Sequence, residues 1–145
     1  MSDALHVTFR VGNADYAIPA TEVLHLESFD QATHVPGAPS YVAGLVQVRG
    51  RLVPVVDLRA RFGLPPIDRT MDHRIVVVQL GERVAGLLVD AAREVVQLDS
   101  SKVEKPPELI EIQSSGFVRG IATHAKRMFL LVDVPRVIGK ELPHE

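Results

Sequence analysis

Short apolar runs rich in valine and isoleucine, separated by glycine, proline and aspartate, recur along the whole 145-residue sequence. None of them follows the 3.6-residue helical period for more than two turns. Because β-branched residues suit pleated, buried surfaces, many such runs at regular spacing predict a mainly β fold, either barrel or sandwich. The expected strands are residues 5–11, 16–19, 45–48, 52–57, 74–80, 84–90, 94–98, 117–123 and 128–134.

One local pattern occurs twice. "VVDLRARFG" at 55–63 resembles "LVDVPRVIG" at 131–139, and both run from an apolar strand into an aspartate, one helical turn and a glycine. Asp57 and Asp133 are therefore predicted N-caps, and the glycines suit the positive-φ residue after each turn. The repeat indicates two similar halves, such as two small barrels, and repetition by chance in a valine-rich chain is the alternative.

The sequence shows no conventional catalytic pattern. It has no cysteine, no G-x-S-x-G elbow, no histidine pair at helical spacing and no glycine-rich loop before a helix, which argues against metal or cofactor chemistry. Asp57, Asp90 and Asp133 could converge as acid–base carboxylates. Each follows an apolar strand where a cap is wanted, however, so capping is the favoured interpretation and no catalytic centre is expected.

Composition narrows the class of protein further. The net charge is −2, which argues against a nucleic-acid partner, and 46% of residues are hydrophobic, as in ordinary folded domains. No apolar run approaches the ~20 residues that cross a bilayer, and the first ten residues do not resemble a signal peptide. We therefore expect one soluble, intracellular domain spanning residues 1–145.

Residues 28–41 and 100–116 are rich in proline, glycine or charge and are expected to be irregular surface segments. In the second one, Leu109 and Ile110 follow the Pro106–Pro107 pair. Apolar residues in a surface segment often mark a partner site, but they could equally pack down onto the end of a barrel.

The segment "QVRGRL" predicts a tight turn at Arg49 and Gly50 between two pairing strands. Gly50 can supply the positive φ, which leaves the Arg49 side chain free to project outward. A solvated turn arginine is the simpler interpretation, and an interface arginine is the functional one.

Taken together, four segments closely resemble the bacterial chemotaxis coupling proteins, the CheW-like family. They are "FRVGNADYAIP", "VPGAPSYVAGLVQVRGRLVPVVDLRARFGLP", "RIVVVQLGERVAGLLVDAAREVVQL" and "GFVRGIA…RMFLLVDVPRVI", which occur in family order from Phe9 to Ile138. The most specific part is the arginine–glycine turn followed by the strand that ends in "DLRARFG".

The resemblance implies a mainly β fold of two interleaved SH3-like five-stranded barrels with short helical turns. It also implies a non-catalytic cytoplasmic adaptor that links the cytoplasmic tip of a chemoreceptor to a sensor histidine kinase, in arrays at the inner face of the membrane. Receptor tips would dock in an apolar groove between the barrels. The alternative is a regulatory or ligand-binding β-barrel module related to the kinase regulatory domain.

Family positions transfer to individual residues of this chain. The receptor-binding positions are Val23, His25, Leu26, Arg49, Ala92 and Val95, and the kinase-binding positions are Glu104 and Leu109. At His25 the family usually has glutamate, so this chain lacks a negative charge there and could bind its receptor in a pH-dependent way.

Overall fold

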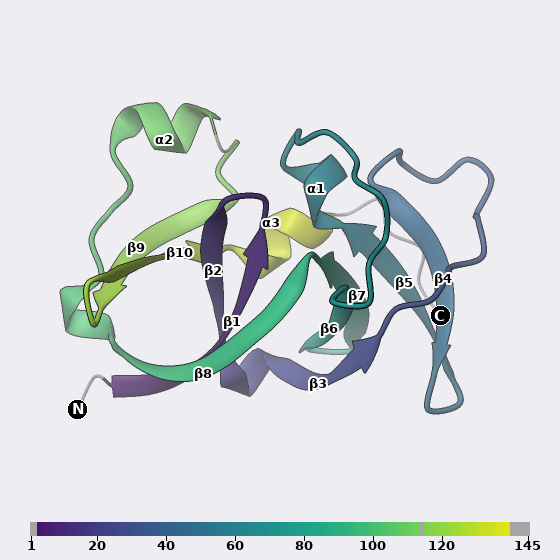
Figure 1. Cartoon of the computed structure of the whole chain (residues 1–145), viewed down its shortest axis with the longest axis horizontal. Coiled ribbons are helices and arrows are strands. Elements are labelled where there is room, and N and C mark those ends of the chain that lie inside the picture. Colours follow the sequence, from purple (N-terminus) through teal and green to yellow (C-terminus); the bar gives the residue numbers. More distant parts are fainter. Residues whose placement is uncertain (1–2, 114, 140–145) are drawn as a thin grey trace.

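The computed structural model describes residues 3–113 and 115–139 and contains two five-stranded sheets lying side by side (Figure 1). Sheet A consists of β1 (Asp3–Val11), β2 (Ala14–Pro19), β8 (Ala91–Asp99), β9 (Val118–His124) and β10 (Arg127–Val132). Sheet B consists of β3 (Val23–Ser28), β4 (Val42–Val48), β5 (Arg51–Asp57), β6 (Arg74–Leu80) and β7 (Arg83–Val89). The short helices are η1 (Ala20–Glu22), α1 (Leu58–Arg61), η2 (Ser100–Lys102), α2 (Glu108–Gln113) and α3 (Val134–Ile138). The mainly β prediction is confirmed.

Each sheet contains strands from both halves of the chain. Sheet A has the order β8-β1-β2-β10-β9 and sheet B the order β3-β6-β7-β5-β4, so corresponding strands occupy corresponding places. In each sheet, a hairpin from one half of the chain pairs with three strands from the other half. The single parallel pairings, β2 with β10 and β5 with β7, also correspond. The two halves therefore have the same topology and have exchanged their first hairpins.

Each sheet curls, and one isolated bridge connects its outer sides. Thr33, after β3, exchanges two backbone hydrogen bonds of 2.8 Å with Leu45 of β4. Glu104, after β8, exchanges two of 2.9 Å with Ile121 of β9. These bridges give both sheets an SH3-like form in which the outer strands meet at a point rather than along their length.

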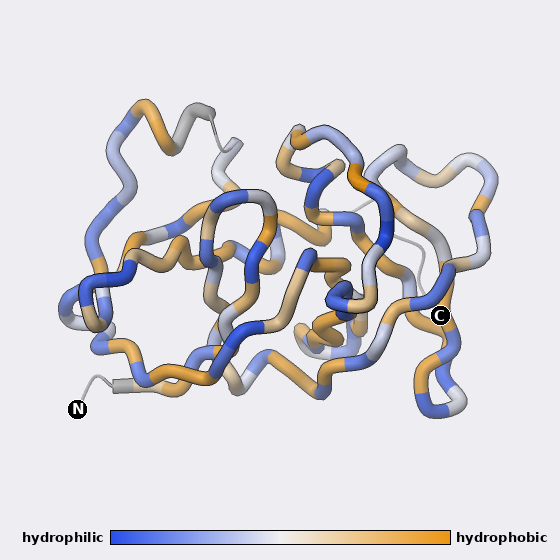
Figure 2. The backbone as a smooth tube through the Cα atoms, viewed as in Figure 1, coloured by the Kyte–Doolittle hydropathy of each residue, from blue (hydrophilic) through white to orange (hydrophobic). Residues whose placement is uncertain are grey.

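The buried side chains form three clusters. An inner core lies within each sheet, and a larger shared core contains residues of both sheets, including Phe9 of β1 and Leu87 of β7. Strand β6 alternates between the two environments, because Ile75 and Val77 enter the inner core of sheet B while Val76 and Val78 enter the shared core. Burial on both faces explains its continuous apolar run, visible in Figure 2 as part of the apolar interior.

Strand β3 was missing from the nine expected strands. It is an edge strand in which half-buried and exposed positions alternate, and it carries His25 and Glu27. A short, half-polar edge strand has no continuous apolar run, so the criterion that found the buried strands passed over it.

The predicted caps are confirmed. The carboxylate of Asp57 accepts a hydrogen bond from the backbone N–H of Arg59 at 3.0 Å, and that of Asp133 accepts from Arg136 at 3.1 Å. Gly63 and Gly139 follow the two helices with φ of 78° and 72°. The same strand–cap–turn unit thus ends β5 and β10.

Asp90 corrects the sequence interpretation, because it caps no helix. It connects β7 directly to β8, and its carboxylate accepts from the backbone N–H of Gly12 at 2.8 Å and from Arg59 at 3.1 Å. Asp57 and Asp90 line one cavity of about 150 Å³ that also contains Arg59, and Asp133 lies outside that cavity. The three aspartates therefore do not converge on one site.

Candidate partner-binding surfaces

Five of the six predicted receptor-binding residues lie on β3 and β8, which are edge strands of the two sheets, and four of these five are apolar. Both strands run along the lower margin of Figure 1, and Figure 2 shows apolar stretches on each. In both strands the predicted residues are three apart: Val23 and Leu26 on β3, Ala92 and Val95 on β8. In a regular strand that spacing would point the two side chains to opposite faces.

A bulge in β3 reverses this expectation. Val23 pairs with Val78 and His25 with Val77, so Leu24 is an extra residue in the ladder. Leu26 consequently pairs with Val76. Because Val76 and Val78 both point into the shared core, Val23 and Leu26 lie on the same face of β3, the face directed toward the other sheet.

A second bulge has the same effect in β8. Ala92 pairs with Phe9 and Val95 with Val7, so β8 contains one residue more than β1 over this stretch. The Thr8 hydroxyl fills the gap, donating to the Glu94 carbonyl at 2.6 Å and accepting from its N–H at 3.0 Å. Ala92 and Val95 therefore share the face of β8 on which Phe9 enters the shared core.

We call Val23, Leu26, Ala92 and Val95 the edge-strand surface. Leu26 is 44% exposed and Val95 58% exposed, whereas Val23 packs partly against the shared core. Leu24, the bulge residue, is also 44% exposed and was not predicted. Large apolar side chains are thus exposed on an edge strand of each sheet, a feature that often accompanies partner surfaces.

His25 and Arg49, the other two predicted residues, lie around one carboxylate. His25 pairs with Val77 and so faces the side of the inner core of sheet B, away from the edge-strand surface. Glu27 on the same face accepts from Arg49 Nε at 3.0 Å and lies 3.7 Å from His25 Nε2. Glu27 is thus the site residue that the sequence analysis missed. Its position two residues after His25 in a strand would have placed both side chains on one face.

The turn at Arg49 differs from the expectation in one respect. Gly50 has φ of 80° as predicted, but Arg49 itself has φ of 52°. Two successive positive φ values in a two-residue hairpin loop are the pattern of a type I′ turn, which favours asparagine or glycine at both positions. The backbone therefore disfavours arginine here, while the side chain remains 68% exposed.

The predicted kinase-binding residues lie in the segment that joins β8 to β9. Leu109 is 64% exposed on α2, a short helix within the segment expected to be irregular. Ile110, by contrast, lines a cavity. Of the two apolar residues of this segment, Leu109 is therefore exposed on the surface and Ile110 forms part of a cavity wall. Glu104 is exposed and contributes its backbone to the bridge with β9.

Within residues 3–113 and 115–139, no helix has the length and apolar character that crossing a bilayer requires. Among the same residues, no group of three or more histidine, cysteine or acidic side chains could hold a metal ion.

The two interleaved five-stranded sheets place this chain in the class of double SH3-like β proteins. The family model described as the CheW-like domain matches residues 5–142, and the chain belongs to that family.

Individual relatives agree over nearly the whole length. A probable chemotaxis protein CheW of Rhizobium etli is 33% identical over 134 residues, covering 92% of this chain and 86% of its own length. The chemotaxis protein CheW of Rhizobium meliloti is also 33% identical, with 93% and 87% covered. The crystal structure of scaffolding protein TtCheW from Thermoanaerobacter tengcongensis superposes with a TM-score of 0.87 at 30% identity, covering 96% and 97% of the two chains.

Proposed function

We propose that this chain is a non-catalytic, cytoplasmic adaptor that couples the tip of a chemoreceptor to the regulatory domain of a sensor histidine kinase in a chemosensory array. Family membership and relatives named as chemotaxis and scaffolding proteins support this function. The structural observation that carries it is the pair of bulges, which turn two apolar residues of each edge strand to the face on the side of the shared core.

The edge-strand surface would bind the receptor. A helical receptor tip presents apolar residues at helical spacing, and the exposed apolar residues of the two edge strands would contact that face of the helix. Burying Leu26 and Val95, both about half exposed now, would contribute about 1–2 kcal/mol each at ordinary transfer values. Arg49, on the hairpin beside β3, would add a charged contact at the rim.

Glu27 would orient that arginine. The carboxylate of Glu27 holds Arg49 at 3.0 Å, and His25 stands beside it where the family usually has an acid. With glutamate at position 25 two carboxylates would compete for Arg49, whereas here Glu27 holds it alone. The arginine would therefore meet a receptor carboxylate in a preset orientation, which lowers the entropic cost of binding.

The exposed face of α2 would bind the kinase. Leu109 projects into solvent next to Pro106 and Pro107, whose fixed φ angles limit the freedom of the loop. A rigid loop that presents one large apolar side chain suits a small contact with the regulatory domain.

The first test replaces Arg49 by asparagine, the residue its turn geometry favours. Arg49→Asn should keep or slightly raise thermal stability, because asparagine tolerates φ near 52° and the exposed ion pair with Glu27 is worth about 0–1 kcal/mol. Binding of a receptor-tip fragment, measured by calorimetric titration, should weaken more than tenfold, since an interface arginine can contribute about 2 kcal/mol.

Sheet A offers a matched control. Ala125 occupies the corresponding turn position with the same φ of 52°, and Ala125→Asn should leave receptor binding unchanged. If Arg49→Asn binds the receptor tip like the unmodified chain, the receptor surface is assigned to the wrong place.

The second test addresses the kinase side. Leu109→Asp should weaken binding of the kinase regulatory domain about tenfold and leave the melting temperature unchanged, because the side chain is exposed. Met128→Asp, an equally exposed position on β10 of sheet A, is the control and should have no effect. Equal loss in both variants, or no loss in Leu109→Asp, would contradict the assignment.

A further inference from the structure

A cavity of about 440 Å³ lies between α1 and the segment that joins α2 to β9. Its walls come from both halves of the fold: Tyr16 and Leu130 from sheet A, Phe62 from the end of α1, and Ile110 from α2. That volume lies within the range of small-molecule sites, which are mostly apolar with few polar groups. Neither surface assigned above includes this cavity.

Aromatic rings form one side of the cavity. Tyr16 stacks on Phe62 with ring centroids 5.1 Å apart, and Phe62 meets Phe117 at 5.8 Å. The Arg61 guanidinium lies 4.8 Å from the Phe117 ring centroid and is the one charged group among the described residues of the lining. A flat aromatic ligand would continue this row of rings, and an anionic substituent would meet the arginine.

The hydroxyl of Tyr16 supplies the second polar group. Tyr16 is 8% exposed and lines the cavity, and its hydroxyl has no hydrogen-bond partner among the described residues. A tyrosine hydroxyl at the wall of an open cavity can donate a hydrogen bond to an acceptor placed there. Burial also raises the pKa of Tyr16, so the hydroxyl keeps its proton and can donate it to an acceptor in the cavity.

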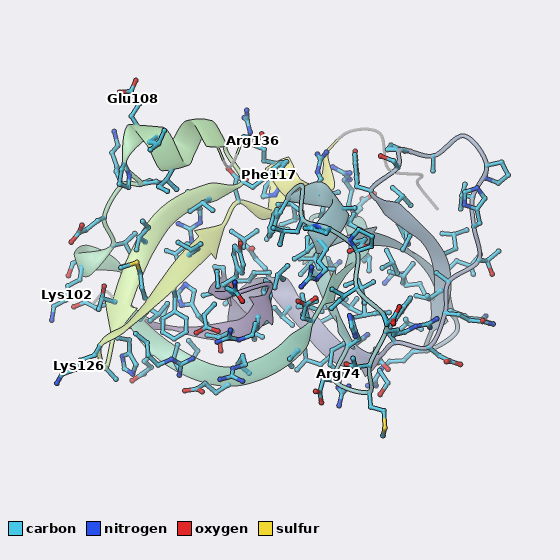
Figure 3. The ribbon with its side chains drawn as sticks, turned by 45° about the horizontal axis from the view of Figure 1, so that its top comes forward. Arg74, Lys102, Glu108, Phe117, Lys126 and Arg136 are labelled. Atoms are coloured by element: carbon cyan, nitrogen blue, oxygen red, sulfur yellow. The ribbon has the colours of Figure 1, made fainter. Side chains whose placement is uncertain are left out.

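The walls are held in place before any ligand arrives. Arg61 donates from Nε to the Val137 carbonyl at 2.9 Å and from a terminal nitrogen to the Arg136 carbonyl at 3.1 Å. Arg136 in turn donates from Nε to the Ser115 carbonyl at 3.0 Å. Figure 3 shows Phe117 and Arg136 close together beside α3, where these bonds tie the cavity wall to the helix.

We propose that this cavity binds a small aromatic carboxylate, whose ring packs against Tyr16, Phe62 and Phe117 and whose carboxylate accepts from Arg61 and the Tyr16 hydroxyl. The bound ligand would also contact Ile110 of α2, the helix that carries Leu109.

The experiment titrates 2-naphthoate into the full chain and follows backbone amide resonances. We expect saturable shifts centred on Gly63, Phe117 and Val118, with a dissociation constant of about 1 mM or below for a ligand of this size. Acetate, which has the charge without the ring, should give no saturable shift. Absence of saturation with 2-naphthoate, or shifts centred away from the cavity, would overturn the proposal.

Two pairs of variants make the test specific. Tyr16→Phe removes only the hydroxyl and should weaken binding roughly fivefold. Ile110→Trp should fill the cavity from α2 and abolish binding, whereas Leu109→Trp changes the exposed neighbour on the same helix and should bind like the unmodified chain. Unchanged binding in Ile110→Trp, or equal loss in both tryptophan variants, would refute the site.

Discussion

The two halves of this molecule repeat the same topology, and they differ most where a partner would touch them. Both β5 and β10 end in a capping aspartate and a short helix, and both edge strands β3 and β8 carry a bulge. The hairpin tips differ: Arg49 and Gly50 in sheet B, Ala125 and Lys126 in sheet A. The features that both halves share, such as the caps and bulges, are explained by the common fold. The features that only one half has are therefore the better candidates for function.

The connections after the edge strands also differ. Residues 29–41, after β3, contain one bridge to β4 and no helix, whereas the segment after β8 contains η2 and α2. Helix α2 carries the exposed Leu109 and forms part of the cavity wall through Ile110. Because the other half folds without such a segment, the shared topology does not require η2 and α2.

The crossovers between hairpin and edge strand give the sharpest contrast. Asp90, between β7 and β8, is bonded to Gly12 and Arg59 and is well satisfied. Glu22, in η1 between β2 and β3, has no hydrogen bond or ion pair among the described residues. Burial is the largest influence on it and raises its pKa. Asp90 therefore stabilises the connection between β7 and β8, whereas Glu22 destabilises the connection between β2 and β3.

The largest expected effect is at Asp90. Asp90→Ala leaves the Arg59 guanidinium and the Gly12 N–H without their acceptor in a mostly buried place, so unfolding free energy should fall by about 2–3 kcal/mol. Asp133→Ala, which removes one helix cap, should cost only about 1 kcal/mol. Urea denaturation measures both, and equal losses would mean that Asp90 is no more than another cap.

The contrast between Asp90 and the caps also shows what the sequence can predict. Asp57 and Asp133 were interpreted correctly, because a cap bonds to residues two or three positions away. Asp90 occurs in a similar local sequence but bonds to residues 78 and 31 positions distant, which no local pattern reveals. The cavity was invisible for the same reason, since Tyr16, Phe62 and Phe117 meet only in the folded chain.

The edge strands make the same point for the candidate site. The family resemblance supplied Val23 and Leu26, but their three-residue spacing appears inconsistent with one face until the bulge is known. A bulge needs the register of two strands, which depends on pairing between distant segments. The positive φ of Arg49 was missed because Gly50 alone accounts for a tight turn locally.

The next effect tests whether the two hairpin tips are equivalent in their backbone. Lys126 has φ of 67° where the other turn has Gly50, so Lys126→Gly relieves a left-handed residue. Relief of the left-handed conformation stabilises the folded state, and the greater entropy of glycine in the unfolded chain offsets part of this gain. The free energy of unfolding should therefore rise by about 0.5 kcal/mol. Gly50→Lys should lower it by a similar amount, since its surroundings are open and only φ opposes a side chain. Changes of the same sign in both variants would show that the turns are not equivalent.

The smallest effect concerns Glu22. Its pKa is raised above the ordinary glutamate value, first by burial and also by Asp133, with Arg119 and His6 acting in the opposite direction. The folded state therefore binds this proton more tightly than the unfolded state, so its contribution is favourable at acid pH and is lost as pH rises through the raised pKa. Glu22→Gln should raise the urea midpoint slightly at pH 7, by an amount within about 0.5 kcal/mol. At pH 4 and below, the variant and the unmodified chain should converge, because the glutamate is then protonated too. A gain that stays constant across this pH range would show that the desolvated charge is not its source, and the two crossovers would then differ in hydrogen bonding alone.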